Sequence, residues 1–196
     1  GSTAPLSSQD KGSYGIQWWM FIKDWNYGYG QEKKVLVRND PTNAAIMNPS
    51  VSLHPTDNTL KISVSLFPSS SGDAMKLEPA PATGSTSATD DVFVCEVTSI
   101  PLQSWFSVGL TVFERNIDVY IDGKLVKSCL LPGVPKPAIG DIKITPDGGF
   151  SGYVCDVVTV PRMLTPSDTL VYYTNGTTCK SKTDTTSIAQ DTTGYS

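Results

Sequence analysis

The sequence has few of the residues from which most catalytic and metal-binding sites are built. Among its 196 residues there are one histidine, His54, and four cysteines, and no two cysteines form a Cys-x-x-Cys pair. A structural zinc site would need closer spacing or more ligands, so this pattern argues against one. His54 lies directly before Pro55 at the end of an expected strand. We expect it to face solvent or cap a turn rather than to act in catalysis.

Excess charge of one sign and long apolar runs are also missing. Charged residues make up 17% of the chain, the formal net charge is -4 and the pI is about 4.9, without any basic run. These features argue against a nucleic-acid or anionic-membrane partner. No stretch approaches the about 18 consecutive apolar residues of a membrane-spanning helix, so we expect no membrane insertion. No amphipathic helix of any length is indicated.

Residues 104–128 instead contain three alternating segments joined by two tight turns. Period-two alternation with β-branched and aromatic side chains is typical of half-buried strands. Asp122-Gly123 predicts a type I′ hairpin turn, because that turn needs positive φ at both central positions. Residues 114–116 form the other turn, so the stretch predicts a three-stranded antiparallel meander. Trp105 and Tyr120 are expected to fill the space between two sheets.

Further strands are expected on both sides of this meander. In the first, one face carries Ile16, Trp18, Met20 and Ile22, and the other Gln17, Trp19, Phe21 and Lys23. The others cover residues 34–38, 51–54, 60–67, 92–99, 141–145 and 150–160. Residues 40–49 are expected to form a loop broken by prolines, and residues 165–168 to start one helical turn. About ten short strands predict an all-β fold, a two-sheet antiparallel β-sandwich or jelly roll.

Three segments of different composition are expected along the chain. Residues 1–12 are predicted to be a flexible segment whose Gly1-Ser2 resembles a cloning remnant, residues 13–176 a single sandwich domain, and residues 177–196 a Ser/Thr-rich tail. Residues 68–91 form a long irregular stretch, either a binding loop or slack. We expect the chain to be one module of a longer protein.

The even number of cysteines favours two disulfides, with four buried free thiols as the alternative. The cysteines are Cys95, Cys129, Cys155 and Cys179. Asn175-Gly176-Thr177 is an N-glycosylation sequon, which agrees with an oxidising compartment.

One aromatic loop is a candidate sugar-binding site. Trp25, Tyr27 and Tyr29 stand close to Asp24 and Asn26 in the sequence. Aromatic rings stack on apolar sugar faces, while carboxylate and amide groups bind hydroxyls. The structural alternative is that Trp25 and one tyrosine cover the edge of the core, as amphipathic rings often do.

Three pieces of the sequence resemble a known superfamily. Trp105 starts the run WFSVGLTV after Ser104, residues 117–126 read IDVYIDGKLV, and residues 150–168 read FSGYVCDVVTVPRMLTPSD. In this order and spacing they resemble the concanavalin A-like lectin/glucanase sandwiches, in particular the laminin G-like jelly-roll domains, over residues 14–176. Residues 100–105 and 129–135 also look like laminin G-like modules of large DNA viruses. The resemblance implies a fold and leaves the function open.

The resemblance also implies a disulfide pattern and a metal. Laminin G-like domains often join a cysteine on the last long strand to one near the C-terminus, which implies Cys155–Cys179 and leaves Cys95–Cys129. The rival pairing is Cys95–Cys155 with Cys129–Cys179. Many members bind calcium through loop carboxylates and carbonyl oxygens. The candidate calcium ligands here are Asp57, Asp90, Asp91 and Asp147, with Asp24, Asn26 and Asn58.

A glucanase of this superfamily would need the paired carboxylates of an E-x-D-x-x-E strand, which the sequence lacks. Asp118 and Asp122 are the nearest pair, and Asp122 belongs to a turn. We therefore expect a non-catalytic recognition module, lectin-like and glycan-binding, on a secreted, cell-surface or virion-surface protein, with no required cofactor except calcium as a candidate. The alternatives are a structural virion or adhesin domain that binds other protein chains, and a divergent polysaccharide-active enzyme.

Overall fold

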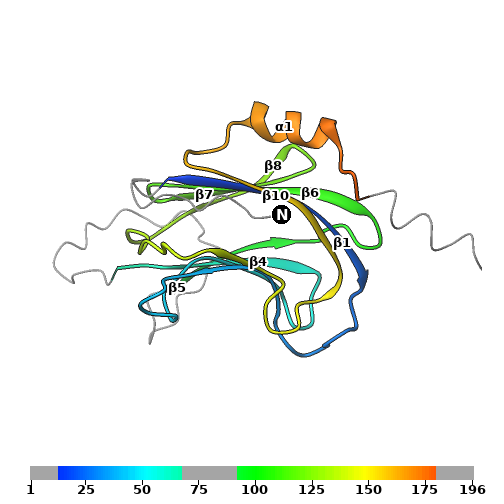
Figure 1. Ribbon diagram of the computed structural model, residues 1–196, viewed down its shortest axis with the longest axis horizontal. Helices are drawn as coiled ribbons and strands as arrows, with labels where there is room; N and C mark the ends of the chain where they lie inside the picture. The colour runs from blue at the N-terminus through cyan, green and yellow to red at the C-terminus, as the bar shows by residue number, and fades with distance from the viewer. Residues whose placement is uncertain (1–12, 68–91, 180–196) are drawn as a thin grey trace, which may run out of the picture.

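The computed structural model describes residues 13–67 and 92–179, which form two packed layers (Figure 1). Within this part, ten strands form two five-stranded antiparallel sheets, with orders β10-β1-β6-β7-β8 and β5-β4-β3-β2-β9. The elements are β1 (Tyr14–Asp24), β2 (Lys33–Asn39), β3 (Met47–Leu53), β4 (Thr59–Ser65), β5 (Val92–Thr98), β6 (Trp105–Phe113), β7 (Asn116–Ile121), β8 (Lys124–Leu130), β9 (Ile142–Ile144), β10 (Ser151–Val160) and α1 (Pro166–Asn175). The predicted all-β sandwich is confirmed. The predictions for residues 1–12, 68–91 and 180–196 lie outside the described residues.

The core lies between the inner faces of the two sheets. Ile16, Trp18, Met20 and Ile22 of β1 all belong to it, whereas Trp19 does not. The two faces predicted for the first strand are therefore confirmed. Burial of such an apolar stripe is the main favourable term in forming the sandwich, at roughly 25 cal/mol per Å² of apolar surface.

The predicted meander is β6, β7 and β8. Its second turn has φ of 50° at Asp122 and 74° at Gly123, as the type I′ assignment requires. The carboxylate of Asp122 also accepts a hydrogen bond from the backbone N–H of Ser107, at 2.9 Å. Asp122 is thus a turn residue, and its side chain fixes the hairpin to β6.

Strand β3 begins earlier than the sequence predicted. It starts at Met47 and includes Pro49, which the sequence analysis placed in a loop. Proline lacks a backbone N–H and is tolerated where the ladder leaves it unpaired. The β3–β4 ladder starts only at Ser50, and the β2–β3 ladder has an irregularity between its pairs at Val37 and Asn39, so Pro49 lies where no partner is required.

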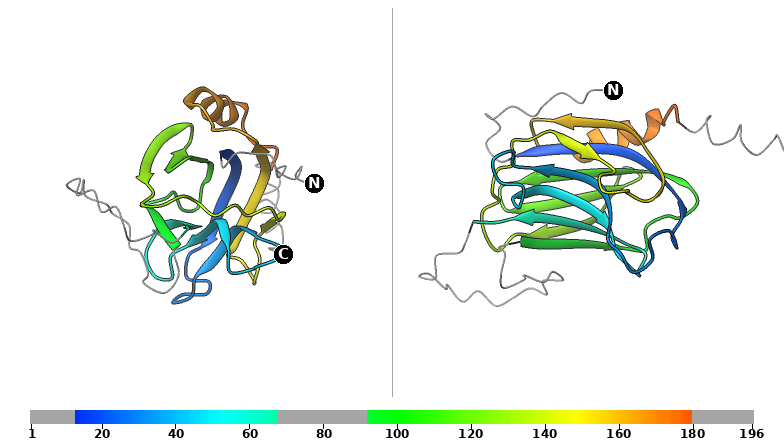
Figure 2. Two further views of the ribbon diagram at one scale, coloured as in Figure 1. Left: turned by 90° about the vertical axis from the view of Figure 1, so that its left-hand side faces the viewer. Right: turned by 60° about the horizontal axis from the view of Figure 1, so that its bottom comes forward.

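Helix α1 was predicted only as one possible turn, and this prediction was too short. Thr165 and Asp168 form a capping box, and Pro166 occupies the first turn. Of its residues only Thr169 is buried, so the helix has no apolar stripe that periodicity could detect. It lies across the outer face of the first sheet, where an added Cβ on Gly109 would be 2.9 Å from the Thr169 side chain (Figures 1 and 2). The missing Cβ of Gly109 lets the helix approach this closely.

Two aromatic residues lie on the opposite face from the one predicted. The core contains Phe106, Val108 and Leu110 of β6, but neither Trp105 nor Tyr120. Tyr120 is buried on the outer face, opposite Gly109 in the β6–β7 ladder and under α1. Because side chains alternate along a strand, Trp105 must face away from the core once Phe106 faces into it.

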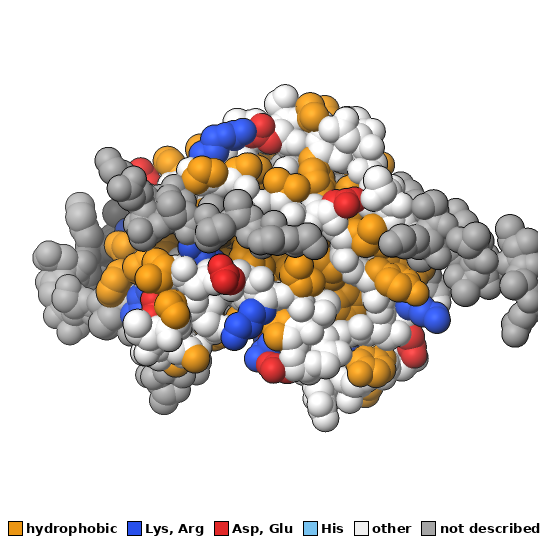
Figure 3. All heavy atoms as spheres, viewed as in Figure 1, with side chains coloured by type: hydrophobic (Ala, Val, Ile, Leu, Met, Phe, Trp, Pro, Cys, Tyr) orange, Lys and Arg blue, Asp and Glu red, His pale blue; other side chains and the backbone are white. Residues whose placement is uncertain are grey.

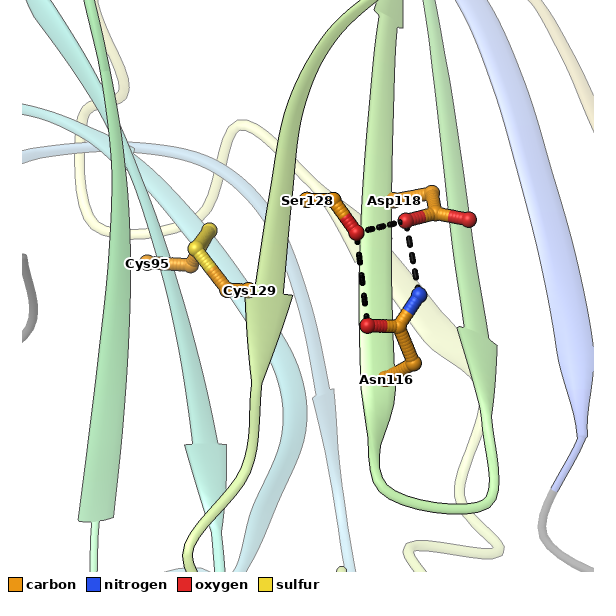
Figure 4. Close-up of a disulfide and its surroundings, with 5 residues drawn as sticks. All are labelled: Cys95, Asn116, Asp118, Ser128 and Cys129. Atoms are coloured by element: carbon orange, nitrogen blue, oxygen red, sulfur yellow. Dashed lines mark hydrogen bonds between the residues drawn. A yellow bond between two sulfur atoms is a disulfide. The ribbon is translucent and has the colours of Figure 1, made fainter. Parts of the chain in front are cut away.

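Two disulfides hold the edges of the sandwich. Cys95 of β5 is bonded to Cys129 of β8, and these are the edge strands of the two sheets (Figure 4). Cys155 of β10 is bonded to Cys179, beyond α1. This is the pairing that the family resemblance implied. The second bond also ties the beginning of the predicted tail to the sheet.

Several charged side chains of the described residues form ion pairs. On the face seen in Figure 3, charged side chains are scattered, several beside a charge of opposite sign. Lys61 pairs with Glu32 and Lys34 with Asp147. Among the described residues, no helix combines the length and apolar character needed to cross a membrane.

Candidate functional site

Three aromatic side chains from neighbouring strands meet on the outer face of the first sheet. They are Phe21 of β1, Trp105 of β6 and Tyr153 of β10, here called the aromatic face. The ring centroids of Phe21 and Trp105 are 5.7 Å apart, those of Phe21 and Tyr153 6.2 Å, and those of Trp105 and Tyr153 6.2 Å. None of the three belongs to the core, and Tyr153 is 48% exposed.

The strand register explains how the rings meet. Phe21 pairs with Trp105 in one ladder and with Tyr153 in the other. Trp105 and Tyr153 therefore come from strands two positions apart, about 9.6 Å at the usual strand spacing. Since their centroids are only 6.2 Å apart, these two rings lean toward each other across Phe21. Their planes differ by 25°, which gives two nearly parallel rings supported by a third.

No pattern in the sequence had indicated this cluster as a site. The spacing predicts Phe21 on the same strand face as Gln17, Trp19 and Lys23 and Trp105 in the space between the sheets, and it gives Tyr153 no role. A usable signal existed in β6, where Trp105 shares its parity with Ser107, Gly109 and Thr111, a set too small and polar for a core face. The pairing of Phe21 with Tyr153 had no local signal, because β1 and β10 lie far apart in the sequence.

In the predicted aromatic loop, one ring packs against the core and the other two are exposed to solvent. The Trp25 ring packs against the core, its Nε1 donates to the Thr56 carbonyl at 3.4 Å, and the Lys33 ammonium lies 4.6 Å from the ring centroid. This ring is therefore a structural cover. Tyr27 and Tyr29 are 51% and 62% exposed.

The polar residues of this loop shape its turn. The Asp24 carboxylate accepts a hydrogen bond from the backbone N–H of Asn26, at 2.9 Å. Such an Asx turn fixes the backbone locally. Asp24 and Asn26 remain exposed. A sugar-binding role for this loop stays a prediction.

The candidate calcium ligands do not come together in the described part of the chain. Asp147 forms an ion pair with Lys34 at 2.6 Å, and this ammonium lowers the pKa of the carboxyl. Asp57 lies 3.5 Å from Nδ1 of His54. No group of three His, Cys, Asp or Glu side chains suited to a metal is found among residues 13–67 and 92–179. Asp90 and Asp91 lie outside the described residues, so calcium binding stays a prediction.

His54 has the capping role expected of it. Its Nδ1 accepts hydrogen bonds from the backbone N–H groups of Asp57, at 3.1 Å, and Thr56, at 3.3 Å. The remaining acidic candidate, Asp118, accepts hydrogen bonds from Asn116 and Ser128 on the outer face of β7 and β8 (Figure 4). Since Asp122 serves the hairpin turn, the two carboxylates have separate structural partners.

Solved structures with a similar fold include binding domains of botulinum neurotoxins. The serotype D binding domain is 9% identical with a TM-score of 0.59, covering 88% of this chain and 37% of that one. The receptor binding domain of the C/D mosaic serotype is 11% identical with a TM-score of 0.60, covering 85% and 37%. The DC binding domain, solved in complex with rat synaptotagmin II, is 13% identical with a TM-score of 0.56, covering 84% and 36%.

These similarities show the β-sandwich fold. The chain spans less than two fifths of the length of each of these structures. No protein-family model and no curated protein matches the sequence.

Proposed function

We propose that this domain is a non-catalytic recognition module that binds a glycan on the aromatic face. It is a laminin G-like member of the sandwich folds and works outside the cell. The two disulfides support the extracellular location, because such bonds persist in oxidising compartments. The observation that carries the binding role is the cluster of three rings on an outer sheet face rather than in the core.

The chemistry of the aromatic face suits a sugar. A pyranose has an apolar face of C–H groups that packs on an aromatic ring and a rim of hydroxyls that stays hydrated. The exposed Tyr153 has a phenol that can donate to or accept from such a hydroxyl. Phe21, with no polar atom, holds the other two rings in place. The rings supply affinity without a charge.

A glycan array tests this proposal. The chain should bind a defined subset of glycans, and Trp105→Ala and Tyr153→Ala should each weaken that binding at least tenfold. Phe67→Ala removes a ring that is 49% exposed outside the aromatic face, and it should leave binding unchanged. Equal loss in all three variants, or retained binding in Trp105→Ala, would contradict the assignment.

The same array, run with calcium and after EDTA, tests the metal prediction. Binding that EDTA removes would direct attention to Asp24, Asn26, Asp57 and Asp147. Binding that is the same in both conditions would assign recognition to the rings alone. Incubation with a polysaccharide panel, followed by assay of released reducing ends, separates this module from a divergent polysaccharide-active enzyme.

A protein partner is the second candidate, and the edge strand β8 favours it. Leu125, Val126 and Leu130 are all exposed there, Leu130 by 72%, as is Val134 in the following segment. Exposed apolar residues on an edge strand are typical of surfaces that meet another chain. Light scattering measures whether the purified chain associates. A blank glycan array, together with association that is lost in Leu130→Asp, would support this role instead.

A further inference from the structure

The sequon of this chain lies at the end of α1, in an accessible position. Asn175 is the last residue of the helix and is exposed, and Gly176 follows it with φ of 71°. The Thr177 hydroxyl donates to the carboxylate of Asp156 on β10. The segment after the helix is further fixed by the bond between Cys155 and Cys179. Asn175 is therefore presented at a defined place beside the sheet.

Asn175 is one of the residues that line a groove of about 260 Å³. The groove runs between α1 and the first sheet and is open to solvent on one side. Gln17 and Val160 line it from the sheet, and Ser167, Val171, Tyr172 and Asn175 line it from the helix. Its size is suited to one sugar ring.

The lining of the groove is mixed but carries no free charge. Gln17 is only 7% exposed, and its amide nitrogen has no hydrogen-bond partner. A buried donor without an acceptor is unfavourable, so an incoming oxygen atom that accepts from it would be stabilised there. Arg162 and Asp168 also line the groove, but they neutralise each other through two hydrogen bonds of 2.6 and 3.0 Å. These features favour a neutral, hydroxyl- or amide-bearing ligand.

We propose that Asn175 carries an N-linked glycan whose first N-acetylglucosamine packs into this groove. Modification joins Nδ2 of Asn175 to C1 of the first sugar of a polyprenyl-pyrophosphate-linked oligosaccharide. The C1–O bond breaks, the pyrophosphate leaves with its electron pair, and Nδ2 loses one proton. In the groove, Val160 and Val171 contact the apolar parts of the sugar, and an oxygen of the sugar accepts the hydrogen bond that Gln17 can donate.

The tether explains why so open a groove can hold a single sugar. A free monosaccharide would lose its translational and rotational entropy on binding and would therefore bind weakly. A sugar attached to a lining residue has an effective concentration in the millimolar range, which is enough to populate a weak site. This proposal is independent of the aromatic face, which lies on other residues.

The experiment uses the full chain secreted from a eukaryotic host and trimmed by an endoglycosidase to one N-acetylglucosamine. Mass spectrometry should find this sugar on Asn175 and none in Asn175→Gln. In NMR spectra, the acetyl methyl group should show nuclear Overhauser contacts to Val171 and to the Tyr172 ring. The trimmed chain should unfold about 1–2 °C higher than Asn175→Gln, the shift expected for a weak site filled by a tethered ligand.

A filled groove provides the control. Val171→Trp should keep the sugar on Asn175 but remove the contacts to Tyr172 and the difference in melting temperature. Val134→Trp makes the same change at an exposed site outside the groove and should keep both. If Asn175 is unmodified, the proposed glycosylation is wrong. If Asn175 is modified but its sugar shows no contact with the helix, the proposed packing of the sugar in the groove is wrong. Trp105→Ala should affect neither readout, so failure here is distinct from failure of the glycan array.

Discussion

Replacing Trp25 by alanine separates the two interpretations of the aromatic loop. The Trp25 ring is half-buried against the core, and the Lys33 ammonium makes a cation–π contact with it, 4.6 Å from the ring centroid. Truncating a fully buried tryptophan costs about 3–5 kcal/mol, so half of that, about 2 kcal/mol, is expected here. Loss of the cation–π contact adds about 1 kcal/mol. The expected loss of unfolding free energy is therefore about 3 kcal/mol.

Lys33 should keep its main hydrogen bond in the Trp25→Ala variant. Its side chain is only 3% exposed, and its ammonium donates to the Trp25 carbonyl at 3.2 Å. That carbonyl belongs to the backbone and remains in Trp25→Ala, so the charge keeps a hydrogen bond. The loss should thus stay near the sum of the packing and cation–π contributions. A loss of 3 kcal/mol corresponds to a melting temperature lower by about 6–12 °C for a domain of this size.

Urea unfolding followed by far-ultraviolet circular dichroism measures this loss, and the glycan array measures binding. Trp25→Ala should lower the unfolding midpoint and leave binding intact at a temperature where the variant is folded. Tyr29→Ala removes a ring that is 62% exposed in the same loop and should change the stability by less than about 0.5 kcal/mol. Loss of binding in Trp25→Ala with a stability change below about 1 kcal/mol would refute the reasoning and restore the loop as the binding site.

Three further predictions concern the scaffold. Replacing Cys95 and Cys129 by alanine should lower the unfolding free energy by about 4 kcal/mol, the loop-entropy value for a separation of 34 residues, and urea unfolding with and without reductant checks it. Gly152→Ala should cost at least about 1–3 kcal/mol and also weaken glycan binding, because its Cβ would lie 2.0 Å from the Phe21 carbonyl oxygen under the aromatic face; a variant of unchanged melting temperature would contradict this. The Arg162 guanidinium and the helix cap hold the pKa of Asp168 well below its usual range, so its contribution is present above pH of about 4 and is lost as the pH falls further. The stability difference between the native chain and Asp168→Asn should therefore be constant from neutral pH down to about 5 and shrink in stronger acid; a difference independent of pH would contradict it.

Much of the scaffold could be predicted from the sequence because its signals are local. Alternation along β1 predicted that Ile16 and Trp18 share one face with Met20 and Ile22, and the structure confirms this shared face, which lies in the core. Asp122-Gly123 predicted the hairpin turn because few residues accept positive φ. Both signals act over a few residues, where steric limits and side-chain alternation leave few choices.

The sequence predicted only the first turn of helix α1, because the rest of the helix depends on tertiary contacts. Its sequence has a capping box but little apolar periodicity, and what holds it is the surface beneath it. Tyr172 donates a hydrogen bond of 2.6 Å to the Asp156 carbonyl, and both rings of Tyr172 and Tyr173 stack on Trp19. Propensity alone could not indicate a helix that the sheet stabilises from outside.

The sequence by itself determined the two-sheet all-β fold, the hairpin turn at Asp122-Gly123 and the residues that share a face of β1, because these follow from residue spacing along one strand. Only the tertiary structure decided which outward side chains meet. Phe21, Trp105 and Tyr153 are separated by many residues, and they form one surface because β1 lies between β6 and β10 in a specific register. The pairing of distant strands depends on the whole core, so it cannot be predicted from a local pattern. Both proposed sites depend on this pairing.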